Sequence, residues 1–225
     1  MKINNVEELL KTISVLYVED DEQTAQAMAK YIQKRVKNLF VTSNGEYGLD
    51  LFQSKKIDLI ITDIKMPYMN GIDMVKAIKK IKKDVKVIFI SAYHEDDLFL
   101  KAIEVGADGF LTKPVSAANG LLPLMHKATI EIVKDRMLSE YTKTLKLILD
   151  YVDSMVIVTD GEKLFNANQS FLKFFGCNEF KTFSQKHPKL HEIFTQSDGF
   201  ISGAHWLDKA IATTPTKVKI EKKIF

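Results

Sequence analysis

The sequence has few of the features that mark secreted, membrane-embedded or nucleic-acid-binding proteins. Its 225 residues include a single cysteine, Cys177, which cannot form an internal disulfide and suits a reducing compartment. No apolar run approaches the ~20 residues that span a bilayer, and the N-terminus lacks the basic-then-apolar pattern of a signal peptide. The 32 basic and 29 acidic residues nearly balance, so the charge indicates no nucleic-acid or membrane partner. We therefore expect a cytoplasmic protein.

The first half of the chain alternates apolar runs with helical patterns. Five runs indicate strands, at residues 13–18, 39–42, 57–62, 85–90 and 109–112. They are continuously apolar, as strands of a buried parallel sheet are. Between them apolar residues recur at helical spacing, as at Ile72, Val75 and Ile78, and a further helix is expected to start near Ser116. Five strands alternating with helices predict a doubly wound α/β fold.

Polar side chains follow four of these strands. They are Glu19 and Asp20 after the first strand, Asp63 after the third, Ser91 after the fourth and Lys113 after the fifth. The carboxyl ends of parallel strands meet at one edge of the sheet, where ligands bind in open α/β folds. Three carboxylates held together would repel one another unless a cation neutralised them, and an all-oxygen site suits Mg²⁺. With a lysine and a hydroxyl beside them, this edge predicts a phosphoryl-binding site.

Each of these residues also has a purely structural interpretation. The acidic run 19–21 could cap the helix that follows it, and Asp63 could only shape a turn. Ser91 could be an N-cap, and Lys113 a solvated surface residue. We favour the phosphoryl site because such residues occur together at four strand ends.

Four motifs occur in a fixed order within residues 12–122. They are Leu16-Tyr17-Val18-Glu19-Asp20-Asp21, Asp63-Ile64-Lys65-Met66-Pro67-Tyr68-Met69-Asn70-Gly71, Ile90-Ser91-Ala92-Tyr93 and Gly106-Ala107-Asp108-Gly109-Phe110-Leu111-Thr112-Lys113-Pro114. Together they resemble the receiver domain of two-component response regulators. The resemblance implies a flavodoxin-like, five-stranded parallel sheet of order 2-1-3-4-5.

By this resemblance, Asp63 accepts a phosphoryl group from the phosphohistidine of a sensor histidine kinase. Asp20 and Asp63 would bind Mg²⁺ directly, Glu19 would act through water, and Lys65 would offer its backbone carbonyl. Asp21 falls one place beyond the acid pair, so we expect it to cap the next helix. The domain would be a regulatory phosphoacceptor, which catalyses only its own phosphorylation and dephosphorylation.

The resemblance also implies a switch. Lys113 would pair with the phosphoryl oxygens, and its bond to Pro114 at the rim of the site is expected to be cis. Ser91 would move to bond the phosphoryl group, and Phe110 would then turn inward. Tyr93 would border the site. Phe110 could instead be an ordinary apolar strand residue.

After residue 122 the helical pattern continues to about Val152. Apolar residues recur at alternating spacings of three and four, which is typical of a coiled coil, at Leu138, Tyr141, Leu145, Ile148 and Val152. An earlier stripe at Met125, Ala128 and Ile132 has a different phase. We expect residues 123–152 to link two domains and to pair as a parallel homodimer. The alternative is an amphipathic helix packed on its own domain.

Residues 153–225 combine a strand, a turn and a returning strand with Phe171-Leu172-Lys173-Phe174-Phe175-Gly176. This order resembles the opening of a PAS domain. The later segments Asp198-Gly199-Phe200, Trp206 and 216–220 fit the same family. A PAS sheet needs more strands than residues 216–225 can supply, so we expect an α+β domain that is incomplete at its C-terminus.

The leading interpretation is an input module. Its receiver (residues 1–122) would signal through the helix to the PAS-like region and to an output beyond Phe225, either a histidine kinase or a diguanylate cyclase. One alternative is a Mg²⁺-dependent phosphatase or phosphotransferase with an aspartyl nucleophile, although the haloacid-dehalogenase type would carry a second Asp where Lys65 stands. Another is a receiver-like scaffold that is never phosphorylated, against which the intact acid pair, Ser91 and Lys113 argue.

Overall fold

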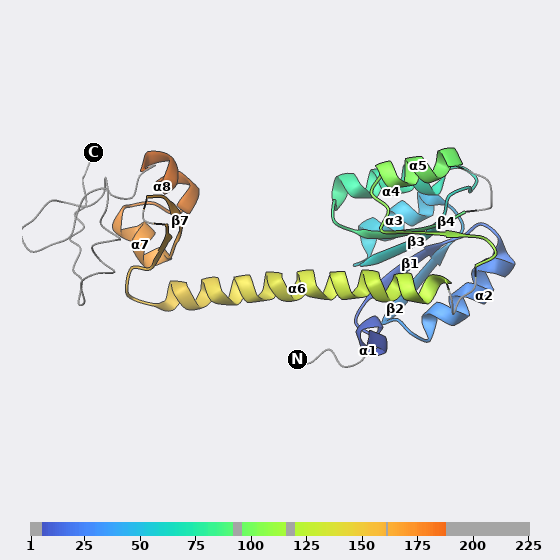
Figure 1. Cartoon of the computed structure of the whole chain (residues 1–225), viewed down its shortest axis with the longest axis horizontal. Coiled ribbons are helices and arrows are strands. Elements are labelled where there is room, and N and C mark those ends of the chain that lie inside the picture. Colours follow the sequence, from blue (N-terminus) through green and yellow to red (C-terminus); the bar gives the residue numbers. More distant parts are fainter. Residues whose placement is uncertain (1–5, 92–95, 116–119, 161, 188–225) are drawn as a thin grey trace, which may run out of the picture. The chain divides into compact units, whose positions relative to one another are not determined.

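The computed structural model describes residues 6–91, 96–115, 120–160 and 162–187. The chain divides into two compact units, Met1–Met137 and Leu138–Phe225. Figure 1 labels the helices and strands. Among the described helices, none is both long and apolar enough to cross a membrane.

The first unit is built on five parallel strands. They are β1 (Ser14–Val18), β2 (Asn38–Thr42), β3 (Leu59–Asp63), β4 (Lys86–Ser91) and β5 (Gly109–Thr112). Their order in the sheet is β2-β1-β3-β4-β5, and every neighbouring pair is parallel. The flavodoxin-like order 2-1-3-4-5 is thereby confirmed. β1 and β3 lie side by side, so the residues that follow them share one edge of the sheet.

Helices cover both faces of the sheet. They are α1 (Val6–Leu10), α2 (Glu22–Gln33), α3 (Gly45–Ser54), α4 (Gly71–Ile81), α5 (Asp96–Glu104) and α6 (Leu122–Tyr151). On one face α3, α4 and α5 pack against Leu16 and Val18 of β1; on the other, α1, α2 and the start of α6 pack against Val15 and Tyr17 (Figure 1). Both sets of alternating side chains are therefore buried, which explains why the strands are apolar without interruption.

Side-chain caps fix where three helices begin. The side chains of Asp21, Asn44 and Asn70 accept hydrogen bonds from backbone N–H groups at the starts of α2, α3 and α4, at 2.8, 3.1 and 2.9 Å. Each cap satisfies a donor that has no partner within its helix. The predicted capping role of Asp21 is confirmed, and the caps place three helix N-termini just after strands of the sheet.

The start of α6 belongs to the first unit. The α-helix is described from Leu122 onward, and the predicted start near Ser116 lies outside the described residues. Its buried side chains join the core beside α2, at Met125, Ala128, Thr129 and Ile132. Two ion pairs add to this packing at the edge of the sheet where β3 and β4 begin: Arg136 with Asp58, and Glu131 with Lys86.

The second unit contains a small antiparallel hairpin and two short helices. They are β6 (Ile157–Thr159), β7 (Leu164–Ala167), α7 (Gln169–Phe174) and α8 (Phe180–Lys186). Phe171, Leu172, Cys177 and Phe183 form its buried centre. The strand-turn-strand-helix order agrees with the prediction. The later motifs, 198–200, Trp206 and 216–220, lie outside the described residues, so the PAS-like domain stays a prediction.

Asn168 joins the end of α6 to this hairpin. Its side-chain amide donates to the backbone oxygens of Leu149 and Ser154, at 2.8 and 2.9 Å. Its side-chain oxygen accepts from the backbone N–H groups of Val156 and Phe171, at 2.9 and 3.2 Å. One buried residue thus satisfies backbone groups from the last turn of α6, from the chain entering β6 and from the start of α7.

Gly71 is the position in the first unit where a larger residue should do most harm. A Cβ atom there would lie 2.1 Å from the backbone oxygen of Asp63 and 2.9 Å from Oγ1 of Thr62. We expect Gly71→Ala to lower the free energy of unfolding by about 3 kcal/mol in urea titrations, because backbone must move. Gly48→Ala is the control, since its Cβ would meet the flexible end of Met74. Equal losses for the two variants would contradict this account.

Candidate functional site

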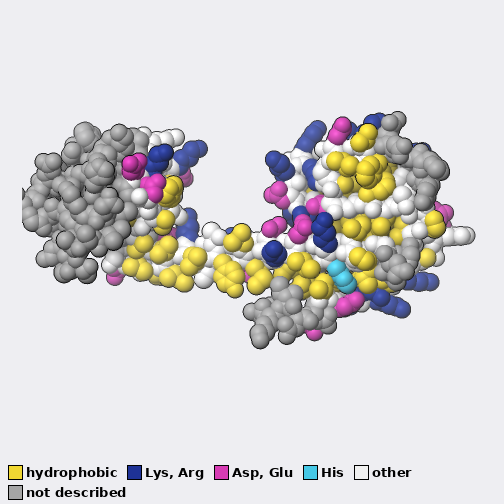
Figure 2. Space-filling view, viewed as in Figure 1, with side chains coloured by type: hydrophobic (Ala, Val, Ile, Leu, Met, Phe, Trp, Pro, Cys, Tyr) yellow, Lys and Arg dark blue, Asp and Glu magenta, His cyan; other side chains and the backbone are white. Residues whose placement is uncertain are grey.

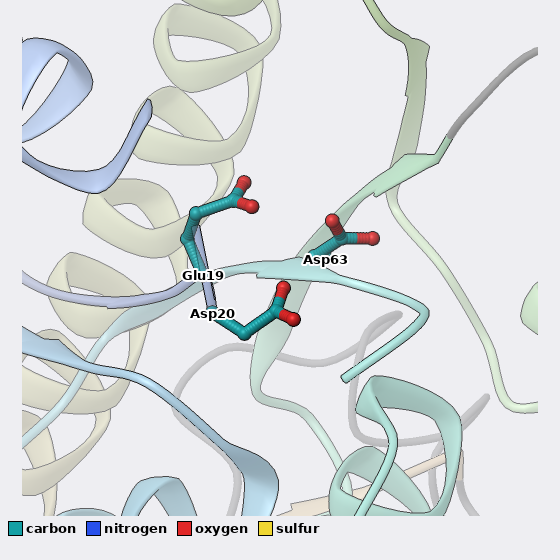
Figure 3. A group of neighbouring side chains, drawn as sticks. All are labelled: Glu19, Asp20 and Asp63. Carbon is teal, nitrogen blue, oxygen red and sulfur yellow. The ribbon is translucent and has the colours of Figure 1, made fainter. Parts of the chain in front are cut away.

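Three carboxylates meet at the C-terminal edge of the sheet (Figure 3). Glu19 and Asp20 directly follow β1, and Asp63 is the last residue of the neighbouring β3. One carboxylate oxygen from each lies within 4.8 Å of those of the other two. The structure therefore brings together the three acids that the strand-end pattern singled out.

The three acids differ in their access to solvent. Glu19 and Asp63 are only 2% and 6% exposed, whereas Asp20 is exposed. The site thus combines two buried carboxylates with a third that is open to solvent. A reactant can approach from solvent, while charge interactions with the buried pair are screened less than on an open surface.

Lys113 supplies the positive charge of this site. Its Nζ donates to Oε1 of Glu19 at 2.8 Å and to Oδ2 of Asp63. Its backbone N–H donates to the carbonyl oxygen of Ser91 at 2.7 Å, which anchors the chain leaving β5 to the end of β4. The Lys113–Pro114 bond is cis, as the resemblance implied.

Burial and the ion pairs act on the pKa values in opposite directions. Burial raises the pKa of the Glu19 carboxyl, and the hydrogen bond from Lys113 offsets only part of that rise. Burial acts to lower the pKa of Lys113, but the hydrogen bonds and charges of Asp63 and Glu19 outweigh it and hold this pKa above its usual value. Lys113 is therefore charged across the physiological range, whereas Glu19 takes up a proton more readily than a solvated glutamate.

Tyr17 is a member of the site that the sequence analysis did not single out. Its fully buried hydroxyl donates to Oε2 of Glu19 at 3.3 Å. Burial and the Glu19 charge raise the pKa of this hydroxyl, so it stays protonated. The sequence could have indicated this contact, because residues two apart on a strand, such as Tyr17 and Glu19, point to the same side of the sheet. Both carboxylate oxygens of Glu19 thus have partners, Lys113 on one and Tyr17 on the other.

The remaining predicted residues are placed as follows. The backbone N–H of Lys65 donates to Oδ1 of Asp63 at 3.2 Å, while the predicted role of the Lys65 carbonyl stays a prediction. Ser91 is fully buried at the end of β4, next to the strand that carries Asp63. Pro114 is exposed at the rim. Tyr93 lies outside the described residues.

Phe110 lies on β5 and is half-buried. Its ring packs edge-to-face with that of Phe99 on α5, with the ring centres 4.9 Å apart and the planes at 89°. This is a favourable geometry for two aromatic rings. In this arrangement Phe110 connects β5 to the helix beside it, and its proposed inward turn stays a prediction.

The donor set fits a hard divalent cation. All three acidic side chains offer oxygen, and one of them remains open to solvent, so bound water can complete the coordination. Neither cysteine nor histidine belongs to this cluster, whose oxygen-only chemistry suits Mg²⁺ better than Zn²⁺. Glu19, Asp20 and Asp63 are therefore the residues that could hold such an ion.

The lysine's role can be tested through the pH dependence of stability. Lys113→Met should lower the free energy of unfolding by about 2 kcal/mol near pH 8, because two carboxylates lose their partner; the partial exposure of Lys113 keeps this loss below that of a fully buried pair. The folded-state pKa of Glu19 lies above its unfolded value of 4.5. Protonation on lowering the pH therefore stabilises the folded state, and the loss should shrink towards pH 5. Urea titrations at both pH values in a chelating buffer, with Lys113→Arg as control, measure this. An identical loss at both would contradict it.

Comparison with known proteins points to one family. The family model of the response regulator receiver domain matches residues 15–122. A cyclic di-GMP phosphodiesterase of Thermotoga maritima is 30% identical over 164 residues, which cover 71% of this chain and 41% of that protein. A cell cycle transcriptional regulator of Caulobacter vibrioides is 35% identical over 100 residues, which cover 44% of this chain and 43% of that protein. The chain thus spans about two fifths of the length of these relatives.

A solved structure matches just over half of the chain. The N-terminal domain of an uncharacterized protein from Wolinella succinogenes is 34% identical, with a TM-score of 0.51, over 55% of this chain and 99% of that one. The family match agrees with the strand order β2-β1-β3-β4-β5 and with the acids and lysine at its C-terminal edge. Residues 15–122 are therefore a response regulator receiver domain, the phosphoacceptor part of a two-component signalling system.

Proposed function

We propose that Asp63 is the phosphoacceptor and that it takes its phosphoryl group from a phosphohistidine of a sensor histidine kinase. The observation that carries this proposal is the hydrogen bond between Lys113 and Asp63 inside the carboxylate cluster. In the transfer, a carboxylate oxygen of Asp63 forms a bond to phosphorus. The bond from phosphorus to the histidine nitrogen breaks, and its electron pair returns to the imidazole.

Each neighbour of Asp63 has a part in this step. Lys113 can turn its ammonium group from the carboxylates to the phosphoryl oxygens, whose negative charge it offsets. Glu19, Asp20 and Asp63 would hold Mg²⁺, with the backbone carbonyl of Lys65 as a further ligand. When bound, the ion offsets the charge that the carboxylates and phosphoryl oxygens bring together. Tyr17 keeps the Glu19 carboxylate in place through its hydroxyl.

The response to phosphorylation would begin at Ser91 and Phe110. We propose that the Ser91 hydroxyl bonds the phosphoryl group and that Phe110 turns inward from its contact with Phe99. Lys65, Tyr93 and Pro114 would border the site. The state of the receiver would then pass along α6, which continues from the receiver core into the second unit.

The second unit and the output complete the proposal. Residues 153–225 would form a PAS-like domain, α6 would pair with that of a second copy, and an output enzyme, a histidine kinase or a diguanylate cyclase, would follow residue 225. The relative from Thermotoga maritima supports a longer signalling protein, because its aligned stretch of 164 residues exceeds the receiver domain and its name is that of an enzyme of cyclic di-GMP metabolism.

The central test is labelling by a small-molecule phosphodonor. We expect stoichiometric, Mg²⁺-dependent phosphorylation of the wild-type chain, detected by intact-protein mass spectrometry, and none in Asp63→Asn. Asp50→Asn removes an exposed carboxylate on α3 and should be labelled like the wild type. Full labelling of Asp63→Asn would sink the assignment. Sustained turnover of a small phosphate ester would instead support an aspartyl phosphatase.

The metal site has a test of its own. Asp20→Asn removes the exposed carboxylate of the cluster and leaves the buried pair intact. We expect Mg²⁺ affinity, measured by calorimetry, to fall by about tenfold or more, because a direct ligand loses its charge. Asp73→Asn, on the first turn of α4, is the control and should bind Mg²⁺ normally. Unchanged affinity in Asp20→Asn would place the ion elsewhere.

A further inference from the structure

The C-terminal half of α6 carries an apolar row that the described structure leaves open. Residues 138–148 are exposed throughout. Leu138, Tyr141, Leu145 and Ile148 are each more than half exposed, and Val152 continues the row past the helix end. Figure 2 shows hydrophobic side chains gathered along this part of α6. We call these five residues the seam. So many large apolar groups on one side of a helix mark an interaction surface.

The seam does not overlap the surface that α6 uses in its own receiver. Met125, Ala128 and Ile132 are buried in the receiver core, whereas every seam residue follows them in the chain. At 100° per residue, Leu145 lies about 140° around the helix axis from Ile132. No residue serves both surfaces, so a partner can cover the seam without disturbing the receiver core.

The residues beside the seam indicate a second copy of the chain as that partner. The seam repeats every seven residues, which is the pattern that lets two identical helices interlock. The positions that flank it are uncharged, among them Thr142, Thr144 and Leu149. Extending the repeat backwards places Glu131 and Lys134 on it, so two copies would bring like charges together there. The repeat therefore limits the paired stretch to residues 138–152.

The direction of pairing follows from what α6 connects. In each copy the helix runs from the receiver core into the second unit. A parallel pair places the same end of α6 from both copies together, so equivalent receivers can act on equivalent second units.

We infer that residues 138–152 of two copies form a short parallel coiled coil. This inference rests on the homodimer of the proposed function. It narrows the paired region from residues 123–152 to the second half of α6. Helices in proteins are stabilised mainly by packing of an apolar face, so the exposed half of α6 would gain stability from pairing. Two heptads bury little surface, and the dimer should therefore dissociate reversibly on dilution.

Two leucines of α6 provide a matched test. Leu145 lies in the seam and is 59% exposed, whereas Leu147 lies outside it and is 61% exposed. In sedimentation velocity runs over a concentration series, we expect Leu145→Lys to weaken self-association of the 225-residue chain by about tenfold or more, because pairing would bury its charge. Leu147→Lys should match the wild type. A wild-type chain that stays monomeric, or equal effects of the two variants, would overturn the inference.

Disulfide trapping tests the direction. In a Cys177→Ser background, Leu138→Cys should cross-link to itself under mild oxidation if the helices are parallel. Cross-linking only in a mixture of Leu138→Cys with Val152→Cys would show an antiparallel pair, and none in either case would place the interface elsewhere. Phosphodonor labelling of both lysine variants separates the two proposals. Normal labelling with no dimer overturns the seam alone, whereas loss of labelling in the wild type overturns the phosphoacceptor.

Discussion

The receiver depends on one ion pair network, in which Lys113 holds the carboxylates of Glu19 and Asp63 at the edge of the sheet. Each of these groups would be costly to bury alone, since a buried charge without a partner destabilises a fold by several kcal/mol. Together they connect the ends of β1, β3 and β5. The network that offsets the cost of burying these charges also serves the proposed reaction. The Lys113 ammonium group already lies against Asp63, the carboxylate that would accept the phosphoryl group.

The sequence predicted most of this arrangement because topology, rather than detailed packing, brings the residues together. Continuous apolar strands followed by Glu19, Asp63 and Lys113 require only a parallel sheet to become neighbours. Tyr17 was missed because it lies within an apolar strand. A tyrosine there is easily interpreted as one more aromatic core residue rather than as a hydrogen-bond donor. The start of β3 was also misplaced at residue 57. Asp58 uses its carboxylate to bind the backbone of Ser14 and the side chain of Arg136, a long-range arrangement that no local pattern contains.

The two interpretations of α6 concern different halves of the helix. An amphipathic helix packed on its own domain describes Met125, Ala128 and Ile132, which are buried. Leu138 to Ile148 are exposed, and their pairing as a coiled coil stays a proposal. Periodicity could find both rows of apolar residues and their difference in phase. It could not say which row the receiver covers, because that depends on how far the helix runs along the sheet and on the ion pairs of Glu131 and Arg136 that fix it there.

β3 has a consequence that goes beyond holding Asp63. Its last residue, Asp63, belongs to the carboxylate cluster, and the residue just before its first, Asp58, is paired with Arg136 of α6. A strand of this length spans about 17 Å. It is buried in the middle of the sheet and is hydrogen-bonded to β1 on one side and to β4 on the other. The acid of the candidate site and the ion pair with α6 therefore lie at opposite ends of one central strand.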